Sequence, residues 1–479
     1  MTCCEKLSGT NSPSVIPPIE PIDSRAESAQ VSARIDFIEP ERRNSCSINS
    51  PGTYADDSRG VHVEVDSYSE VCSLADRQWA TAALQGGEQP GETPAPCARS
   101  LQTVLHVING EHYSGAERVQ DLLALRLPGF GYGVDFACLK PGKFPNVRLS
   151  QNSPLLRLPM RARWDLRIVY PLIRWARERG PALLHAHTPR ALLVAFFAAR
   201  WLGLPLVYHV HSPARHDSTH HWQNRLNWWL ERLLSRWVDA FVAVSGPTAN
   251  HLRQYGVPCS RIWVVHNGVP INAVPKNEKM LAPDHAVGKT FEVPVVGTVA
   301  LFRPRKGLEV LLEAIDLLHT EGLKVQLLAV GPFESTAYQE QVLGWVKQRG
   351  LEGAVRWAGF TQDVPRALAT MDIFVLPSLF GEGLPMVILE AMATGLPVVA
   401  TAVEGTPEAI THGVEGWLVP PGDPRALAQA IALLVRDRSL AQSMGAAAKR
   451  RQQIEFSDLR MAERLAQIYD RVLRRDCRS

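Results

Sequence analysis

The chain has 479 residues, more than a single hydrophobic core ordinarily serves, so two or three domains are expected. Its formal net charge is +3, which favours no class of charged partner and gives no indication of nucleic-acid binding. The eight cysteines include no C-x-x-C pair, which argues against a zinc scaffold or a disulfide framework and favours a reducing compartment.

Residues 1–100 carry 15 acidic and 8 basic groups and are dominated by Ser, Pro and isolated Gly. Such a segment buries too little apolar area to offset the entropy of ordering, so it predicts a disordered acidic tail. The N-terminus lacks the basic-then-apolar layout of a signal peptide. The most apolar run, 191–207, is interrupted by Arg200, Gly203 and Pro205 and is too short to span a bilayer. We therefore expect a cytoplasmic protein.

From Leu101 onward, short apolar runs alternate with amphipathic segments, which is typical of a doubly wound parallel sheet. We expect strands at 103–108, 132–139, 182–185, 206–210, 240–244 and 262–265. Helices are expected between them at 115–127, 164–179, 190–202, 222–237 and 247–255.

An aperiodic stretch at 267–294 predicts a linker, and a second alternating series follows it. We expect its strands at 295–299, 325–330, 355–358, 373–376 and 398–401, and its terminal helices at 424–436 and 458–474. The expected domains are Rossmann-like units at 101–285 and 286–450, followed by a helical segment at 451–479. The two units would face each other across a central cleft, where open α/β sheets bind ligands.

The most informative segment, residues 378–400, contains two carboxylates, Glu382 and Glu390, separated by seven residues. Pro385 suits the first position of a helix, and Gly395 suits its end. Glu382 would then lie on the loop before the helix and Glu390 two turns into it. The helix start offers free N–H groups and a positive dipole end, which suits a phosphate.

This segment resembles the glutamate-x7-glutamate signature of the retaining glycosyltransferases of family 4, which have the GT-B fold and use nucleotide-activated sugars. The resemblance implies that Glu382 contacts hydroxyls of the donor sugar and that Glu390 contacts the nucleotide ribose. Gly383, Leu384 and Pro385 would complete the donor site between them. The resemblance also implies that the last helix packs back against the N-terminal half.

A second element lies where the first strand of the series leads into a helix. The segment Ser114-Gly-Ala-Glu-Arg118 resembles the Gly-Gly-Ala-Glu-Arg element of the same family, with Ser114 in place of the first Gly. Gly115 lets the backbone approach a phosphate or a sugar closely, so we assign it to the donor site.

A basic loop, Phe302-Arg-Pro-Arg-Lys-Gly307, follows the first strand of the second series. A guanidinium fork and a mobile ammonium both suit a diphosphate. The resemblance implies that Arg303 and Lys306 neutralise the leaving diphosphate. The family's Arg usually stands five or six residues before the Lys, so Arg303 and Arg305 remain alternatives.

The segment Ala402-Val-Glu-Gly-Thr-Pro-Glu408 could form another anion cradle, in which Thr406 caps a helix started by Pro407. The resemblance assigns Gly405 and Thr406 to donor binding. The family usually has Gly-Gly where this chain has Glu404-Gly405. Because a carboxylate repels a diphosphate, we expect Glu404 to point away or to contact the sugar or acceptor.

Histidines concentrate in the first half of the folded region. They are His185, His187, His209, His211, His216, His220 and His221. Strand alternation places His209 and His211 on one face. The resemblance implies that His211 contacts the donor sugar and helps to position the acceptor, and it places His187 on the acceptor side. Metal ligation is an alternative, but the spacing matches no strong zinc pattern and we expect no metal site.

The folded part contains no Asp-x-Asp motif, so the leaving-group charge would be met by Arg303, Lys306 and helix N-termini without a metal or a cofactor. Between Arg148 and Arg236, 14 arginines stand against four acidic residues, with several tryptophans. This region predicts either peripheral contact with an anionic membrane at its inner face or buried tryptophans beneath a solvated basic face.

The expected function is transfer of a sugar from a nucleotide-diphosphate sugar to a glycan, lipid-linked or small-molecule acceptor, with retention of configuration. Alternatives are a catalytically inactive nucleotide- or sugar-binding scaffold and a GT-B phosphorylase. A dinucleotide oxidoreductase is disfavoured because no G-x-G-x-x-G follows either first strand.

Overall fold

The computed structural model describes residues 101–162, 165–212, 228–229, 231–271 and 293–476. The predicted acidic tail at 1–100 lies outside the described residues, as do most of the expected linker and much of the helix expected at 222–237.

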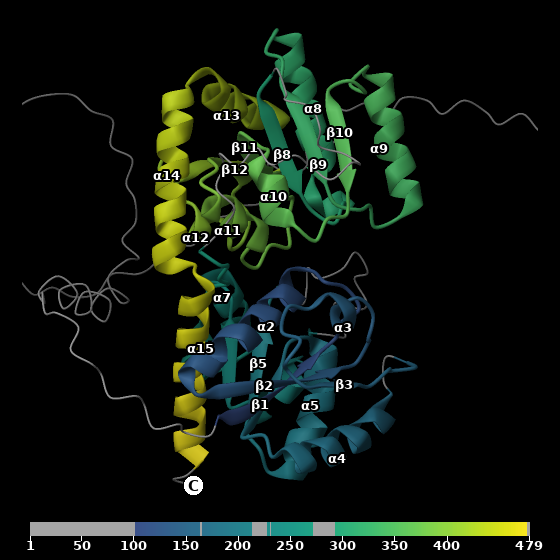
Figure 1. Ribbon diagram of the computed structural model, residues 1–479, viewed down its shortest axis with the longest axis vertical. Coiled ribbons are helices and arrows are strands. Elements are labelled where there is room, and N and C mark those ends of the chain that lie inside the picture. The colour runs from purple at the N-terminus through teal and green to yellow at the C-terminus, as the bar shows by residue number, and fades with distance from the viewer. Residues whose placement is uncertain (1–100, 163–164, 213–227, 230, 272–292, 477–479) are drawn as a thin grey trace, which may run out of the picture. The chain divides into compact units, whose positions relative to one another are not determined.

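The first half of the folded region is built on a parallel seven-stranded sheet with the order β3-β2-β1-β4-β5-β6-β7 (Figure 1). Its strands are β1 (Gln102–Ile108), β2 (Tyr132–Cys138), β3 (Leu155–Arg157), β4 (Leu183–Ala186), β5 (Leu206–Val210), β6 (Ala240–Ala243) and β7 (Ile262–Val264). Its helices are α2 (Gly115–Arg126), α3 (Phe144–Val147), α4 (Val169–Arg179), α5 (Pro189–Leu202) and α7 (Gly246–Gln254). Short 3-10 turns occur at η1 (Leu127–Phe130), η2 (Leu166–Ile168), η4 (Ser235–Trp237) and η5 (Cys259–Arg261).

The second half contains a parallel six-stranded sheet with the order β10-β9-β8-β11-β12-β13. Its strands are β8 (Val295–Val299), β9 (Gln326–Val330), β10 (Val355–Gly359), β11 (Ile373–Leu376), β12 (Val398–Thr401) and β13 (Gly416–Val419). Its helical elements are η6 (Pro304–Lys306), α8 (Leu308–Thr320), α9 (Thr336–Gln348), α10 (Val364–Ala369), α11 (Met386–Ala393), α12 (Thr406–Ala409) and α13 (Pro424–Arg436). The chain continues with α14 (Arg438–Glu455) and α15 (Asp458–Asp476).

Strand alternation in the first sheet separates two cores. Leu105 and Val107 of β1 join the apolar cluster that includes α4 and α5, which pack against each other. Val104 and Ile108 point to the opposite face, where α2 and α15 contribute to a second cluster. Because the strands are covered on both faces, they appear in the sequence as nearly continuous apolar runs.

The last helix, α15, contacts α2 and η1 of the first half. Its apolar stripe includes the buried residues Met461, Leu465 and Tyr469. Polar contacts fix its position as well. Tyr132 donates a hydrogen bond of 2.6 Å from its hydroxyl to Asp470 Oδ1. In the described part of the chain, no helix combines the length and apolar content needed to cross a bilayer.

The two facing parallel sheets confirm the predicted α/β GT-B fold class. Five helices and strands were missed, and two of them are the short helices α3 and α10. The strand β3 has three residues, β13 is also short, and α14 buries only Met444, Gly445, Ala448 and Gln452, which is too few for a clear helical period. The helix expected at 164–179 begins only at Val169, after the turn η2.

Two glycines within helices provide a test of packing. A Cβ on Gly445 in α14 would lie 2.2 Å from the carbonyl oxygen of Gly395, whereas a Cβ on Gly344 in α9 would have no atom within 4 Å. We expect Gly445→Ala to lower stability by about 1–3 kcal/mol because α14 must move outward. Gly344→Ala should raise it by about 0.5–1 kcal/mol, since alanine loses less entropy in a helix. Urea midpoints of the two variants and the parent measure this, and equal shifts would contradict the packing described.

Candidate functional site

A buried ion pair joins the basic loop to the signature segment. The turn η6 brings Lys306 Nζ onto Glu382 Oε1, with the side chains 16% and 7% exposed. Ser378 Oγ donates a second hydrogen bond of 2.6 Å to the same carboxylate oxygen. Gly307, at φ +65°, permits this turn, because a Cβ there would lie 2.0 Å from the carbonyl oxygen of Pro377. Lys306 and Glu382, predicted to act at one site, are therefore in direct contact.

Burial and charge compete at this pair. Burial raises the pKa of Glu382, but Lys306, Arg305 and the Ser378 hydroxyl outweigh it and hold the pKa below its usual range. Burial also lowers the pKa of Lys306, and Glu382 opposes that shift only in part. Glu382 is therefore held as a charged carboxylate, and the Lys306 ammonium beside it loses its proton more easily than a lysine in water does.

The two candidate arginines have different partners. Arg305 donates from one guanidinium nitrogen to the carbonyl oxygens of Phe380 and Gly381, at 3.2 and 2.9 Å, and so holds the signature loop. Arg303 lies 3.5 Å from Glu334 Oε1, and the Glu334 side chain is 49% exposed. An ion pair of this exposed kind is weak and exchanges readily for another anion.

Glu404 is turned onto the loop that precedes α11. Its carboxylate accepts hydrogen bonds from the backbone N–H groups of Gly381 and Glu382, at 3.0 and 2.9 Å. Its φ of +34° lies in the left-handed region, which explains why glycine is usual at this position in the family. The carboxylate is thus bound to two amides within its own half.

Glu390 meets a partner from the first half. It is 4% exposed on α11 and forms an ion pair with Arg118 of α2. Burial raises the pKa of Glu390, and Arg118 only partly offsets this rise. Gly115, at the start of α2, lies against the beginning of α11, because a Cβ there would be 3.5 Å from Met386 Cγ. Arg118 was part of the Ser-Gly-Ala-Glu-Arg element but was not predicted as a site residue.

The signature loop touches the end of β5 very closely. A Cβ on Gly383 would lie 1.9 Å from the carbonyl oxygen of His211, and one on Gly405 would lie 1.6 Å from the carbonyl oxygen of Gly383. The carbonyl oxygen of the next residue, Leu384, accepts a hydrogen bond of 2.8 Å from Asn267 Nδ2. Gly383, Leu384 and Gly405 therefore lie where the two halves meet.

Two local predictions are wrong. Pro385 is the N-cap of α11, with an extended ψ of 113°, and Met386 is the first helical residue. Thr406 does not cap a helix with its side chain. It is the first residue of the short helix α12, Gly405 is the cap, and the Thr406 side chain is buried. In both places the observed start of the helix differs from the predicted one by a single residue.

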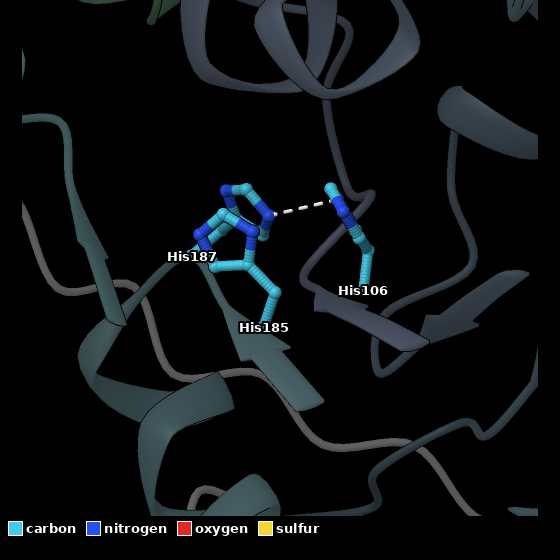
Figure 2. Close-up of side chains that lie close together, drawn as sticks. All are labelled: His106, His185 and His187. Atoms are coloured by element: carbon cyan, nitrogen blue, oxygen red, sulfur yellow. Dashed lines mark hydrogen bonds between the residues drawn. The ribbon is translucent and has the colours of Figure 1, made fainter. Parts of the chain in front are cut away.

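Five buried or half-buried histidines gather at the carboxyl ends of β1, β4 and β5. They are His106, His185, His187, His209 and His211. His106 lies directly opposite His185 in the strand register. Figure 2 shows these two rings with that of His187, whose Nε2 lies 3.0 Å from His106 Nδ1. The rings of His209 and His211 stack at 4.3 Å between centroids, which confirms their predicted common face.

Burial lowers the pKa of all five histidines, to about 3 for His106 and about 4 for His211. They are therefore neutral near pH 7. Two groups that share His187 bring one nitrogen from each member within 4.8 Å of the others, close enough to hold a metal ion. Neither group includes a carboxylate among the described residues. His106 was not predicted as a site residue. The alternation of side chains along the predicted first strand could have indicated that it shares a face with the other histidines.

Comparisons with known proteins agree with this fold. Residues 113–273 match the family model described as Glycosyltransferase Family 4, and residues 293–437 match that of Glycosyl transferases group 1. The phosphatidyl-myo-inositol mannosyltransferase of Mycobacterium leprae is 30% identical over 284 residues, which are 58% of this chain and 71% of that protein. The chain therefore belongs to the group 1, family 4 glycosyltransferases.

Two further similarities are informative. A putative colanic acid biosynthesis glycosyltransferase of Salmonella typhimurium is 31% identical over 245 residues, 49% of this chain and only 57% of that protein's length. The crystal structure of Anabaena HepE in complex with UDP-glucose covers 77% of this chain and 99% of its own, with a TM-score of 0.66 and 23% identity. At this identity the likeness establishes the fold.

The buried pair gives opposite pH trends for two variants. Glu382→Gln leaves Lys306 charged without its partner, and Lys306→Met leaves a buried carboxylate. Each should cost about 3–5 kcal/mol near neutral pH. The deficit of Glu382→Gln should shrink as pH rises, because the lysine, whose pKa is already lowered, can deprotonate. The deficit of Lys306→Met should shrink as pH falls, because Glu382 can take up a proton.

Chemical denaturation across pH measures both trends, and the double variant should cost less than the sum of the two. Arg349→Gln, which breaks the more exposed pair with Asp316, is the control and should cost ~0–1 kcal/mol at every pH. Parallel pH trends in the two buried variants would contradict the pairing.

Proposed function

We propose that this protein transfers a sugar from a UDP-sugar to a hydroxyl of a glycan, lipid-linked or small-molecule acceptor, with retention of anomeric configuration. The observation that carries the proposal is the buried Lys306–Glu382 pair, because it sets a cation for a diphosphate beside a carboxylate for sugar hydroxyls. The choice of UDP rests on the similar Anabaena structures, which hold UDP and UDP-glucose.

On this proposal, Lys306 and Arg303 bind the diphosphate. Arg305 is committed to the carbonyl oxygens of the signature loop, whereas Arg303 would exchange an exposed partner for the phosphate. The N-terminus of α11 would add N–H donors. The N–H groups of Gly405 and Thr406, which were also assigned to donor binding, already donate to the carbonyl oxygens of Glu382 and Val403, at 3.2 and 2.9 Å. Lys306, Arg303 and the helix N-terminus can neutralise the leaving diphosphate, so we propose that no divalent ion is needed.

The remaining donor contacts would come from the signature segment. Glu382 would accept hydrogen bonds from the donor sugar, and Gly383, Leu384 and Pro385 would line the path between sugar and diphosphate. Glu390 would bind the ribose after exchanging its ion pair with Arg118 for ribose hydroxyls. Gly115 would lie beside the same region, at the start of α2.

The acceptor would enter on the first-half side. His211 would contact the donor sugar and position the acceptor hydroxyl, and His187, whose Nδ1 lies 3.2 Å from His211 Nε2, would support it. Glu404 would face the sugar or acceptor only after releasing the two amides that it binds. That attachment keeps its charge on the loop and weakens one of the two grounds for an inactive scaffold, which are Glu404 and the unusual spacing of Arg303.

The proposed domain limits are those expected from the sequence. A first unit at 101–285 would supply the acceptor side and a second at 286–450 the nucleotide-sugar side. The segment at 451–479 would return to the first unit, and a tail at 1–100 would precede both.

Nucleotide binding is the first test. In thermal shift measurements on the full chain, UDP at 100 times its Kd should stabilise the protein by ~2.7 kcal/mol, and GDP and ADP should do so less. Glu390→Ala should reduce the UDP effect through the ribose, and Lys306→Ala should reduce it through the diphosphate. Glu313→Ala, an exposed change on α8, is the matched control and should leave it intact.

Catalysis is measured separately from nucleotide binding. The full chain should release UDP slowly from a UDP-sugar in the presence of EDTA, with water or an added alcohol as the acceptor. The glycoside formed on the alcohol should have the α configuration by NMR, since a free sugar would lose its configuration by mutarotation. UDP binding without any turnover would favour the scaffold. No response to any nucleotide, in folded protein, would remove the UDP-sugar assignment.

One face of the first half is rich in arginine and aromatic side chains, and it favours an acceptor that is bound to a membrane. A cavity of about 510 Å³ is lined by Arg200, Arg236 and Arg261 together with Phe196 and Trp237. The edge-to-face contact of Phe196 with Trp237, at 5.3 Å between centroids, ties α5 to η4 there. Large apolar side chains are exposed nearby in the sequence. Phe197 and Trp201 lie on α5, and Trp229 and Leu233 lie shortly before η4.

Arginines interspersed with exposed tryptophans suit an anionic lipid surface. The relative from Mycobacterium leprae is named for phosphatidyl-myo-inositol, a lipid. We therefore propose that this face, defined by Arg200, Trp201, Arg236 and Trp237, rests on the membrane that carries the acceptor.

Vesicle binding tests the basic face. The protein should sediment with vesicles of phosphatidylcholine and phosphatidylglycerol but not with phosphatidylcholine alone. The double variant Arg200→Gln/Arg236→Gln should bind about 10-fold or more weakly, since each basic group contributes about 1 kcal/mol near such a surface. Arg436→Gln/Arg438→Gln removes the same charge from exposed positions in the second half. Equal losses in the two double variants would show a general charge effect instead of this face.

A further inference from the structure

The buried histidines form a continuous hydrogen-bonded chain that begins on the last helix. The Tyr469 hydroxyl lies 2.7 Å from His185 Nδ1 and 3.2 Å from His106 Nε2. His106 Nδ1 lies 3.0 Å from His187 Nε2, and His187 Nδ1 lies 3.2 Å from His211 Nε2. The central link is the dashed line in Figure 2.

We propose that Tyr469 is a positioning residue that determines, through His106 and His187, which ring nitrogen of His211 carries the proton. The consequence for catalysis rests on the proposed function, in which His211 contacts the donor sugar and the acceptor. The tautomer itself is a property of the protein alone and can be measured without substrate.

Neutrality leaves the chain only two consistent states. A neutral imidazole has one N–H donor and one acceptor nitrogen, so each ring that donates on one side must accept on the other. His106, His185 and His187 are no more than 2% exposed, and burial disfavours their charged forms. The direction of the first bond therefore fixes the direction of every later one.

The direction follows from the Tyr469 hydroxyl, which has a single proton to donate. The hydroxyl oxygen lies 2.7 Å from His185 Nδ1, which suits a hydrogen bond that the O–H group donates. Its distance to His106 Nε2 is longer, at 3.2 Å. In this state Tyr469 donates to His185 and accepts from His106 Nε2–H. The proton of His185 then lies on Nε2, which is buried and has no partner among the described residues. His187 Nε2–H donates to His106, and His211 Nε2–H donates to His187.

This state leaves His211 Nδ1 with a lone pair, and that nitrogen is buried without a hydrogen-bond partner among the described residues. The lone pair could accept a hydrogen bond from a sugar or acceptor hydroxyl once a substrate reaches the buried nitrogen, as the proposed role of His211 requires. The opposite direction would place a proton on Nδ1, and His211 could then only donate.

A metal ion in the same cluster is the competing occupant. The groups that could bind one contain only neutral imidazoles, so a divalent cation would be buried without a compensating carboxylate. His106 Nδ1 and His187 Nε2 lie 3.0 Å apart, a distance that suits a hydrogen bond between them. Elemental analysis of the purified protein distinguishes the relay from a bound metal ion.

The experiment compares two variants that remove one hydroxyl each from the same interface. Tyr469→Phe breaks the start of the chain. Tyr132→Phe removes the bond to Asp470 on the same helix, beside Tyr469 but without a histidine partner. Full-length protein labelled with 15N- and 13C-histidine gives the tautomer of each ring by NMR, and His211→Gln assigns the His211 signals.

In the parent, His211 should be one tautomer with the proton on Nε2, and Tyr132→Phe should preserve it. Tyr469→Phe should give a mixture of the two tautomers with the backbone spectrum retained. If transfer activity is established, the same variant should lower kcat by about twofold when the tautomers become equal, with the KM for UDP-sugar unchanged.

Three outcomes would overturn the proposal: mixed His211 tautomers in the parent, an equal change in Tyr132→Phe, or one equivalent of zinc found by elemental analysis of the purified protein. UDP binding is measured on the same samples. A missing nucleotide response with the tautomer change intact would therefore count against the proposed function and not against the relay.

Discussion

The carboxyl end of β5 and the start of α11 approach so closely that Gly383 and Gly405 have no room for a methyl group. This steric constraint fixes most of the site. It places His211 of the first half against the loop that carries Glu382, and it brings α2 near enough to α11 for Arg118 to reach Glu390.

The two signature carboxylates are buried to a similar extent but held differently. Glu382 is surrounded by Lys306, Arg305 and the Ser378 hydroxyl, and its pKa is depressed. Glu390 has Arg118 as its compensating charge, and burial prevails, so its pKa is raised. Glu382 is therefore the more firmly charged of the two carboxylates, and Glu390 is the more readily protonated.

Local patterns predicted the two α/β halves and the signature helix because parallel strands buried on both faces leave continuous apolar runs in the sequence. They missed α14, whose contact with the second half is made through Gly445 and Ala448, small residues that carry little periodic signal. Lys306 and Glu382 could be predicted because each lies in a motif at a turn. The pairings of Arg118 with Glu390 and of His106 with Tyr469 could not, since these contacts join residues up to 363 positions apart.

The order of synthesis gives α15 a particular part in folding. The first half emerges from the ribosome long before Tyr469, Met461 and Leu465, yet these residues complete one of its cores and the hydroxyl end of its histidine chain. Until translation ends, the faces of α2 and η1 that α15 will cover are exposed apolar surface, and His106 and His185 lack a partner there. The nascent first half therefore needs either a chaperone or a transient substitute contact for as long as the second half takes to be made.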